Sequence, residues 1–89
     1  MTAIEQAVIE VLREHQKNAR RVDQSEWLYE DLVIGHAKVT TGARRRTVRR
    51  TIARVVDDGI VDRADDSTRF APARKFSLHE QRTMARHDQ

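Results

Sequence analysis

The side chains in this protein with the clearest chemical potential are arginines, and they are concentrated in one short stretch. Residues 44–54 contain no acidic side chain and six arginines, namely Arg44, Arg45, Arg46, Arg49, Arg50 and Arg54. The whole chain of 89 residues carries 17 basic and 14 acidic side chains, net +3, so the remainder carries 11 basic and 14 acidic side chains, net −3. A localised positive patch on a weakly acidic body indicates a polyanionic partner, because guanidinium groups pair well with phosphate oxygens.

Helical periodicity separates these arginines from an apolar stripe. Apolar residues recur at i, i+4, i+7 and i+8, the spacing of one buried helix face, at Val48, Ile52, Val55 and Val56. The pattern predicts a helix over residues 43–58. Gly59 is the glycine expected just after its C-terminus.

The outer face of this predicted helix is basic. At about 100° per residue, Arg46 and Arg50 point away from the apolar stripe. The flanks and edge of the outer face carry Arg45, Thr47, Arg49 and Arg54. A solvated helix face is the alternative interpretation of such a charge run. Solvated faces usually carry acidic residues three or four positions from the basic ones, and this stretch has none, so we favour contact with a nucleic acid.

Two helices are predicted before the basic one. Thr2 and Glu5 have the spacing of a capping box, which predicts a helix over residues 3–17. Residues 20–22 are a candidate very short strand. For the second helix, Asp23 is the expected N-cap and Glu26 its capping-box partner.

Apolar residues support this second helix. Val22 and Trp27 have the spacing of a hydrophobic staple around its start, and its predicted apolar stripe consists of Leu28, Leu32 and Val39. Its end is predicted either near Ile34, before Gly35, or at Thr40 with Gly42 as the stop signal. We favour the longer helix.

A hairpin and a further helix are predicted after the basic helix. Residues 60–64 and 69–71 read as two short strands around a turn, with Pro72 ending the second strand. Phe70 and Phe76 are expected to close the core over the hairpin. A capping box at Ser77 opens a predicted short helix to residue 86. Residues 1–75 are expected to form one domain, and residues 76–89 a C-terminal helix or tail.

The order of helix, helix, turn, basic helix, glycine and hairpin resembles the winged helix-turn-helix family of DNA-binding domains. The likeness rests on residues 41–50, TGARRRTVRR, as the recognition helix and on the spacing of Ile52, Val55, Val56, Gly59, Ile60 and Val61 after them. The likeness covers residues 3–72, and overall the chain is similar to small archaeal and phage-repressor-like winged-helix regulators. The resemblance implies an α+β fold that is mostly α with a small β-hairpin: a three-helix core, a wing and a short C-terminal helix.

The resemblance implies sequence-specific binding of double-stranded DNA and a repressor-like role in transcription regulation. The basic helix would enter the major groove, where arginine pairs bidentately with guanine. Arg45, Arg46 and Arg49 are expected nearest the bases. Thr47 is expected to contact either a base or a phosphate.

The remaining candidate residues are expected on the DNA backbone. Arg50 and Arg54 would hold phosphates, and Arg44 would reach a phosphate at the helix N-terminus, where the dipole favours anions. By analogy with the family, Arg69 and, less directly, Arg63 would follow a flanking minor groove or its phosphates.

Other function classes find less support in the sequence. There is no cysteine, and the four histidines do not cluster at helical spacing, so we expect no metal site, no cofactor and no enzymatic activity. No apolar run reaches the length of a membrane span, so we expect a cytoplasmic, nucleoid-associated protein. A stacking platform for single strands at Trp27 and Tyr29 is the weaker alternative to packing of Trp27 near the core.

Three alternatives stay open at this point. A winged-helix fold can serve as a docking module for an acidic protein partner, because fold does not fix function. An RNA-binding or replication-associated winged helix is the second alternative. The third alternative concerns assembly: residues 76–86 would join two copies of the chain in a homodimer, as in many helix-turn-helix proteins.

Overall fold

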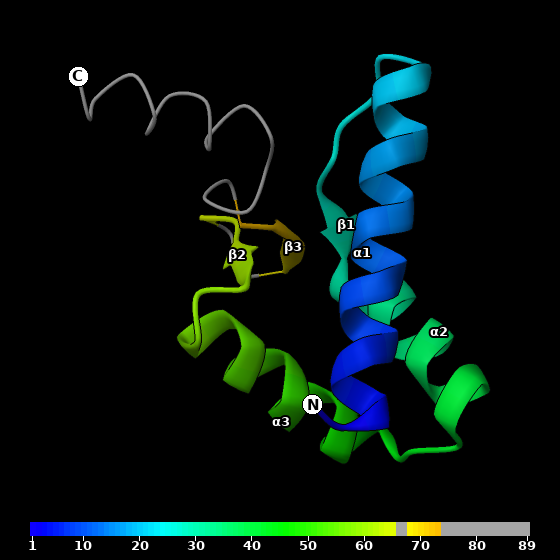
Figure 1. The fold of residues 1–89 in the computed structure, drawn as a ribbon, viewed down its shortest axis with the longest axis vertical. Coiled ribbons are helices and arrows are strands. Elements are labelled where there is room, and N and C mark those ends of the chain that lie inside the picture. Colours follow the sequence, from blue (N-terminus) through cyan, green and yellow to red (C-terminus); the bar gives the residue numbers. More distant parts are fainter. Residues whose placement is uncertain (66–67, 74–89) are drawn as a thin grey trace.

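The computed structural model describes residues 1–65 and 68–73, and in this part of the chain three helices combine with a small sheet (Figure 1). The helices are α1 (Ala3–Arg21), α2 (Glu30–Thr41) and α3 (Arg45–Asp57). The strands are β1 (Leu28–Tyr29), β2 (Val61–Arg63) and β3 (Arg69–Pro72), all antiparallel. The predicted α+β class is therefore confirmed at this level. The predicted helix over residues 77–86, Phe76 and the segment 76–89 lie outside the described residues.

Helix α1 starts where the sequence predicts and ends later. The Thr2 hydroxyl accepts a hydrogen bond from the backbone N–H of Glu5, and the Glu5 carboxylate accepts one from the backbone N–H of Thr2, which confirms the capping box. The helix continues to Arg21, past the predicted residue 17, and Ala19 in the extra turn is buried. The short strand suggested for residues 20–22 is therefore wrong.

The predicted start of the second helix is also wrong. Asp23 has a left-handed φ of 55° and belongs to the turn that follows α1, not to a helix N-cap. Glu26 forms an ion pair with Arg20 at 3.0 Å instead of closing a capping box. Val22 is exposed and Trp27 is half-buried, and both precede the start of α2 at Glu30.

The late start of α2 changes which of its residues are buried. Leu28 is buried, but in strand β1. Leu32 and Val39, expected on the buried stripe, are 59% and 89% exposed. The residues of α2 that enter the core are Val33, Ile34 and Ala37. The longer of the two predicted helices is confirmed, since α2 runs through Gly35 and ends at Thr41, one residue beyond the predicted Thr40. Gly42 caps it with a left-handed φ of 73°.

The sheet has the strand order β1-β3-β2, so the strand that precedes α2 pairs with the last strand of the hairpin. Leu28 lies opposite Phe70, and Val61 lies opposite Pro72 at the other edge. The predicted hairpin strands are confirmed, with Pro72 as the last residue of β3. Strand β1 was not predicted at its position.

Helix α1 is the element on which the others assemble. It packs against α2, α3 and β3, and Figure 1 shows it alongside the sheet with α2 and α3 near its N-terminal half. The core is apolar, and its largest fully buried side chains are Val8, Leu12, Val33, Ile34, Val48, Ile52, Val55, Val61 and Phe70. None of the helices within residues 1–65 and 68–73 is both long enough and apolar enough to cross a membrane.

Candidate nucleic-acid interface

Helix α3 has the two faces that its sequence predicts. It spans Arg45–Asp57 instead of residues 43–58, and Gly59 beyond it has a positive φ of 77°. Val48, Ile52 and Val55 are buried in the core. The site candidates of this region are all exposed: Arg44, Arg45, Arg46, Thr47, Arg49, Arg50 and Arg54.

Arg46 and Arg50 form the outermost part of the basic face. They lie about 160° and 200° around the helix from Val48, at about 100° per residue, and so point away from the core. Within the described residues neither guanidinium has an ion-pair partner. Together with Arg45 and Arg49 they line a shallow surface hollow of about 410 Å³.

Arg45 and Arg49 lie on the flank of α3 that faces α2, and acidic residues of α2 pair with both. Nη2 of Arg45 lies 2.7 Å from Oδ1 of Asp31, and Nε of Arg49 lies 3.4 Å from Oε1 of Glu30. Sequence reasoning missed these two acids, because it found no acid within residues 44–54 and placed the start of the second helix near Asp23. The other four arginines of the run have no ion pair within residues 1–65 and 68–73.

The two ends of the arginine run have different surroundings. Arg44 occupies the N-cap position of α3, and the first turn of that helix has no acidic residue. Arg54 lies near the start of α1, where its charge reaches Glu5. Hydrogen bonds from the backbone and then the side chain of Thr2 lower the pKa of Glu5, and the charges of the N-terminus and of Arg54 act in the same direction. Asp57 and Asp58 are exposed at the far end of α3 and bound the positive face there.

The two arginines expected on the wing differ in their contacts. The guanidinium carbon of Arg63 lies 5.5 Å from the centre of the Phe70 ring, so its planar group covers the sheet. Arg69 is half-buried in β3, opposite Tyr29. The backbone N–H of Glu30 donates a hydrogen bond to the carbonyl oxygen of Thr68 at 2.8 Å, which joins the turn end of the hairpin to the start of α2.

These contacts bring the hairpin end and the basic helix together. Glu30 binds Thr68 through its backbone and Arg49 through its side chain. Arg69 directly follows Thr68, which is bonded to Glu30, and Glu30 in turn contacts Arg49 of the basic helix. Arg63 instead faces the sheet, and its contact with Phe70 sets it apart from the arginines of α3.

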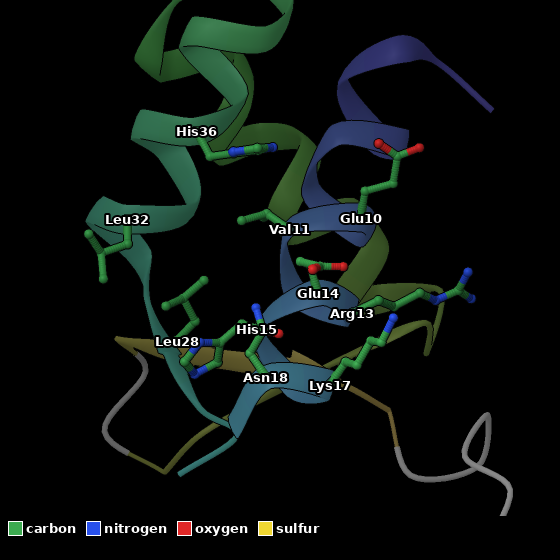
Figure 2. Close-up of a pocket in the computed structure, with 10 residues that line it drawn as sticks. All are labelled: Glu10, Val11, Arg13, Glu14, His15, Lys17, Asn18, Leu28, Leu32 and His36. Atoms are coloured by element: carbon green, nitrogen blue, oxygen red, sulfur yellow. The ribbon is translucent and has the colours of Figure 1, made fainter. Parts of the chain in front are cut away.

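A larger hollow of about 800 Å³ lies between α1 and the start of α2 (Figure 2). Its walls combine apolar residues, such as Val11 and Leu32, with charged residues of both signs. Nε2 of His15 lies 3.0 Å from the carbonyl oxygen of Ser25. Figure 2 shows His36 extending from α2 into the space between the helices. Within residues 1–65 and 68–73, no three His, Asp or Glu side chains come together in a way that could hold a metal ion.

Comparison with known proteins gave no match. No protein-family model, no curated protein and no solved structure matches this chain.

Proposed function

We propose that this protein binds double-stranded DNA by placing α3 in the major groove, and that it regulates transcription as a small winged helix-turn-helix protein. The observation that carries the proposal is the outward face of α3. Arg46 and Arg50 project from it with no acidic partner among the described residues. Outside residues 44–54 the chain is net negative, so this positive face is a local feature and not a general excess of charge.

The shape of the face suits duplex DNA. An α-helix with its side chains is about 10–12 Å across, and the major groove of B-DNA is about 12 Å wide. The guanidinium fork of arginine matches both the O6/N7 edge of guanine and the phosphate oxygens. Arg44 stands at the N-terminus of α3, where the helix dipole also favours a phosphate.

The arrangement of the elements supports the winged-helix part of the proposal. A three-helix core is followed by a hairpin, and the strand before α2 joins the hairpin in one sheet. The turn end of the hairpin is bonded to the first residue of α2, which in turn contacts α3. A short wing beside the basic helix would let Arg69 follow the DNA backbone next to the groove.

The roles expected for individual arginines change with their surroundings. Arg46 and Arg50 point most directly outward, so we assign them to the floor of the groove, and Thr47 beside them to a base or a phosphate. In the free protein, Arg45 and Arg49 form ion pairs with acidic residues of α2, and these pairs must open before either arginine contacts DNA. Arg63 is placed least favourably for DNA, because its guanidinium covers Phe70.

The first experiment titrates a fluorescent duplex of random sequence with the protein and follows anisotropy at two salt concentrations. Binding should weaken steeply with salt, because each neutralised phosphate contributes about −0.9 to the slope of log K against log salt. The double variant Arg46→Ala/Arg50→Ala should lose binding. A matched control, Arg13→Ala/Arg21→Ala, removes the same charge from exposed positions of α1 and should bind nearly as well as the parent chain.

The outcomes separate the alternatives. Equal loss in both double variants would mean that only net charge matters and would count against a site on α3. Absence of binding at low salt, both by the folded protein and by the variant Glu30→Gln/Asp31→Asn in which the acids paired with Arg45 and Arg49 are neutral, would point to an acidic protein partner for the arginines. Preference for duplex RNA would also contradict the proposal, because a helix cannot enter the deep, narrow major groove of A-form RNA.

Sequence specificity is tested next with Arg46→Ala. If Arg46 reads a base, the variant should lose about 1–3 kcal/mol of binding free energy on the preferred site and discriminate less between sequences. An equal loss on preferred and random DNA would instead make Arg46 a phosphate contact.

A further inference from the structure

Two acidic residues of α2 lie at the edge of the basic face, where a DNA-binding surface would be expected to carry none. Asp31 contacts Arg45 at 2.7 Å, and Glu30 contacts Arg49 at 3.4 Å. Asp31 is exposed, with 79% of its side chain accessible, whereas the Glu30 side chain is 24% accessible and its backbone is fixed to Thr68. Both acids belong to the first turn of α2, where the helix dipole favours negative charge.

The ion pairs divide the four arginines that line the surface hollow on α3 into two groups. Arg46 and Arg50 are available to a phosphate as they stand. Arg45 and Arg49 become available only when a phosphate or a base edge takes the place of the carboxylate. Exposed ion pairs are weak and exchange easily, so the pairs can open, but each opening leaves a carboxylate close to the DNA backbone.

We propose that Glu30 and Asp31 restrain the affinity of this protein for DNA of arbitrary sequence by holding Arg45 and Arg49 in the free protein. This inference rests on the proposed function. On arbitrary DNA, the contacts of Arg46 and Arg50 are too few to displace the acids, and Arg45 and Arg49 stay paired with α2. On a matching site, base contacts supply the extra free energy that opens the pairs. The two acids are thus specificity-determining residues that act through the arginines.

The test replaces the acids by their neutral isosteres in Glu30→Gln/Asp31→Asn. Random duplex should bind roughly tenfold more tightly at about 0.1 M salt, since two more arginines reach phosphates and two repulsive charges are gone. The slope of log K against log salt should steepen by about 1.8. A control with the same change in net charge, Asp57→Asn/Asp58→Asn, alters exposed residues at the far end of α3 and should change neither quantity appreciably.

A coupling experiment shows whether the acids act through the paired arginines. In the parent chain, Arg45→Ala/Arg49→Ala should weaken binding to random duplex less than twofold, since those guanidinium groups are already occupied. In the Glu30→Gln/Asp31→Asn background, the same two substitutions should remove most of the tenfold gain and leave only the part that comes from the loss of the two repulsive charges. Circular dichroism and urea unfolding verify the fold of each variant. If Glu30→Gln disturbs α2, the single variant Asp31→Asn, at an exposed position, replaces the double variant and should give about half of its gain in affinity.

The results distinguish this inference from the function on which it rests. If the parent chain binds duplex DNA and the acid variant has the same affinity and slope, the inference is wrong and the proposed function stands. An equal gain in the Asp57→Asn/Asp58→Asn control would also overturn the inference. If the folded parent chain does not bind and the acid variant does, the acids mask the surface, as proposed. If neither binds, both proposals fail.

Discussion

The guanidinium carbon of Arg63 in β2 lies 5.5 Å from the centre of the Phe70 ring in β3, directly across the ladder from it. Phe70 is fully buried and fills the space between the sheet and the helices, whereas Arg63 is exposed. The contact therefore covers the edge of the core with a cation that prefers an aromatic face. Arg63, which the winged-helix resemblance assigns to DNA contact, therefore has a structural contact with Phe70.

Arg63→Ala should lower the free energy of unfolding by about 0.5–1 kcal/mol, the range for an exposed cation–π pair. Urea unfolding followed by Trp27 fluorescence measures the change. Arg63→Lys should lose less, because an ammonium group also interacts with the ring. If the urea midpoint of Arg63→Ala is unchanged while DNA affinity falls, the arginine acts on DNA and not on the sheet.

The two faces of α3 should separate stability from binding. Ile52 is buried with 1% of its surface exposed, and Arg50 points outward from the same helix. Ile52→Val should lower the free energy of unfolding by about 0.5–1.5 kcal/mol and leave DNA affinity within twofold. Arg50→Ala should do the reverse, with a stability change within about 0.5 kcal/mol and a clear loss of affinity. A comparable loss of DNA affinity in folded Ile52→Val would contradict this division.

The capping box of α1 predicts a pH dependence of stability. Hydrogen bonds from the Thr2 backbone and side chain lower the pKa of Glu5 from its ordinary value of 4.5, with help from nearby positive charge. Since the folded state then binds the proton less tightly than the unfolded state, the contribution of Glu5 is fully present above about pH 4.5 and is lost as the pH falls through the lower, folded-state pKa.

Urea unfolding at a series of values between about pH 7 and pH 3 measures this loss. Glu5→Gln should be less stable than the parent chain at neutral pH, and the two curves should converge at the acidic end. Glu10→Gln, an exposed acid of the same helix with no capping role, serves as the control. Curves for Glu5→Gln and the parent chain that stay parallel throughout would show that the carboxylate does not stabilise the helix start.

The sequence was informative where local signals and burial agree. The start of α1 follows from the Thr2–Glu5 spacing, and the buried and exposed faces of α3 follow from its 3.6-residue period. The start of α2 did not follow, because the segment around Asp23 contains cap and staple signals that the tertiary structure overrides. Leu28 and Tyr29 pair with β3 about forty residues away, and no local pattern reveals that pairing.

The same limit applies to the candidate site. Exposure of the arginines could be predicted from one helix alone, since it depends only on their positions relative to Val48 and Ile52. The ion pairs could not be predicted, because Glu30 and Asp31 approach α3 only through the packing of two helices. An incorrect boundary for α2 also placed these acids in mid-helix, away from the end that faces the arginines.

Gly35 inside α2 and Gly42 at its C-cap should respond in opposite ways to alanine. Gly35 lies inside the helix, is exposed, and an added Cβ would meet nothing within 4 Å. Gly35→Ala should therefore raise the free energy of unfolding by about 0.5–1 kcal/mol, the difference between glycine and alanine in a helix interior. Gly42 ends the helix with a φ of 73°. Gly42→Ala should lower the free energy of unfolding by about 1–2 kcal/mol, because the Cβ is strained in the left-handed region.

Urea unfolding of the two variants gives the signs, and Gly42→Asn is the informative intermediate. Asparagine tolerates the left-handed conformation better than alanine does, so Gly42→Asn should recover part of the loss although its side chain is larger. Space is not limiting, since a Cβ at Gly42 also meets nothing within 4 Å. A loss of stability in Gly35→Ala would contradict a continuous α2. It would favour a helix that ends near Ile34, and the placement of Glu30 and Asp31 against α3 would then need to be measured again.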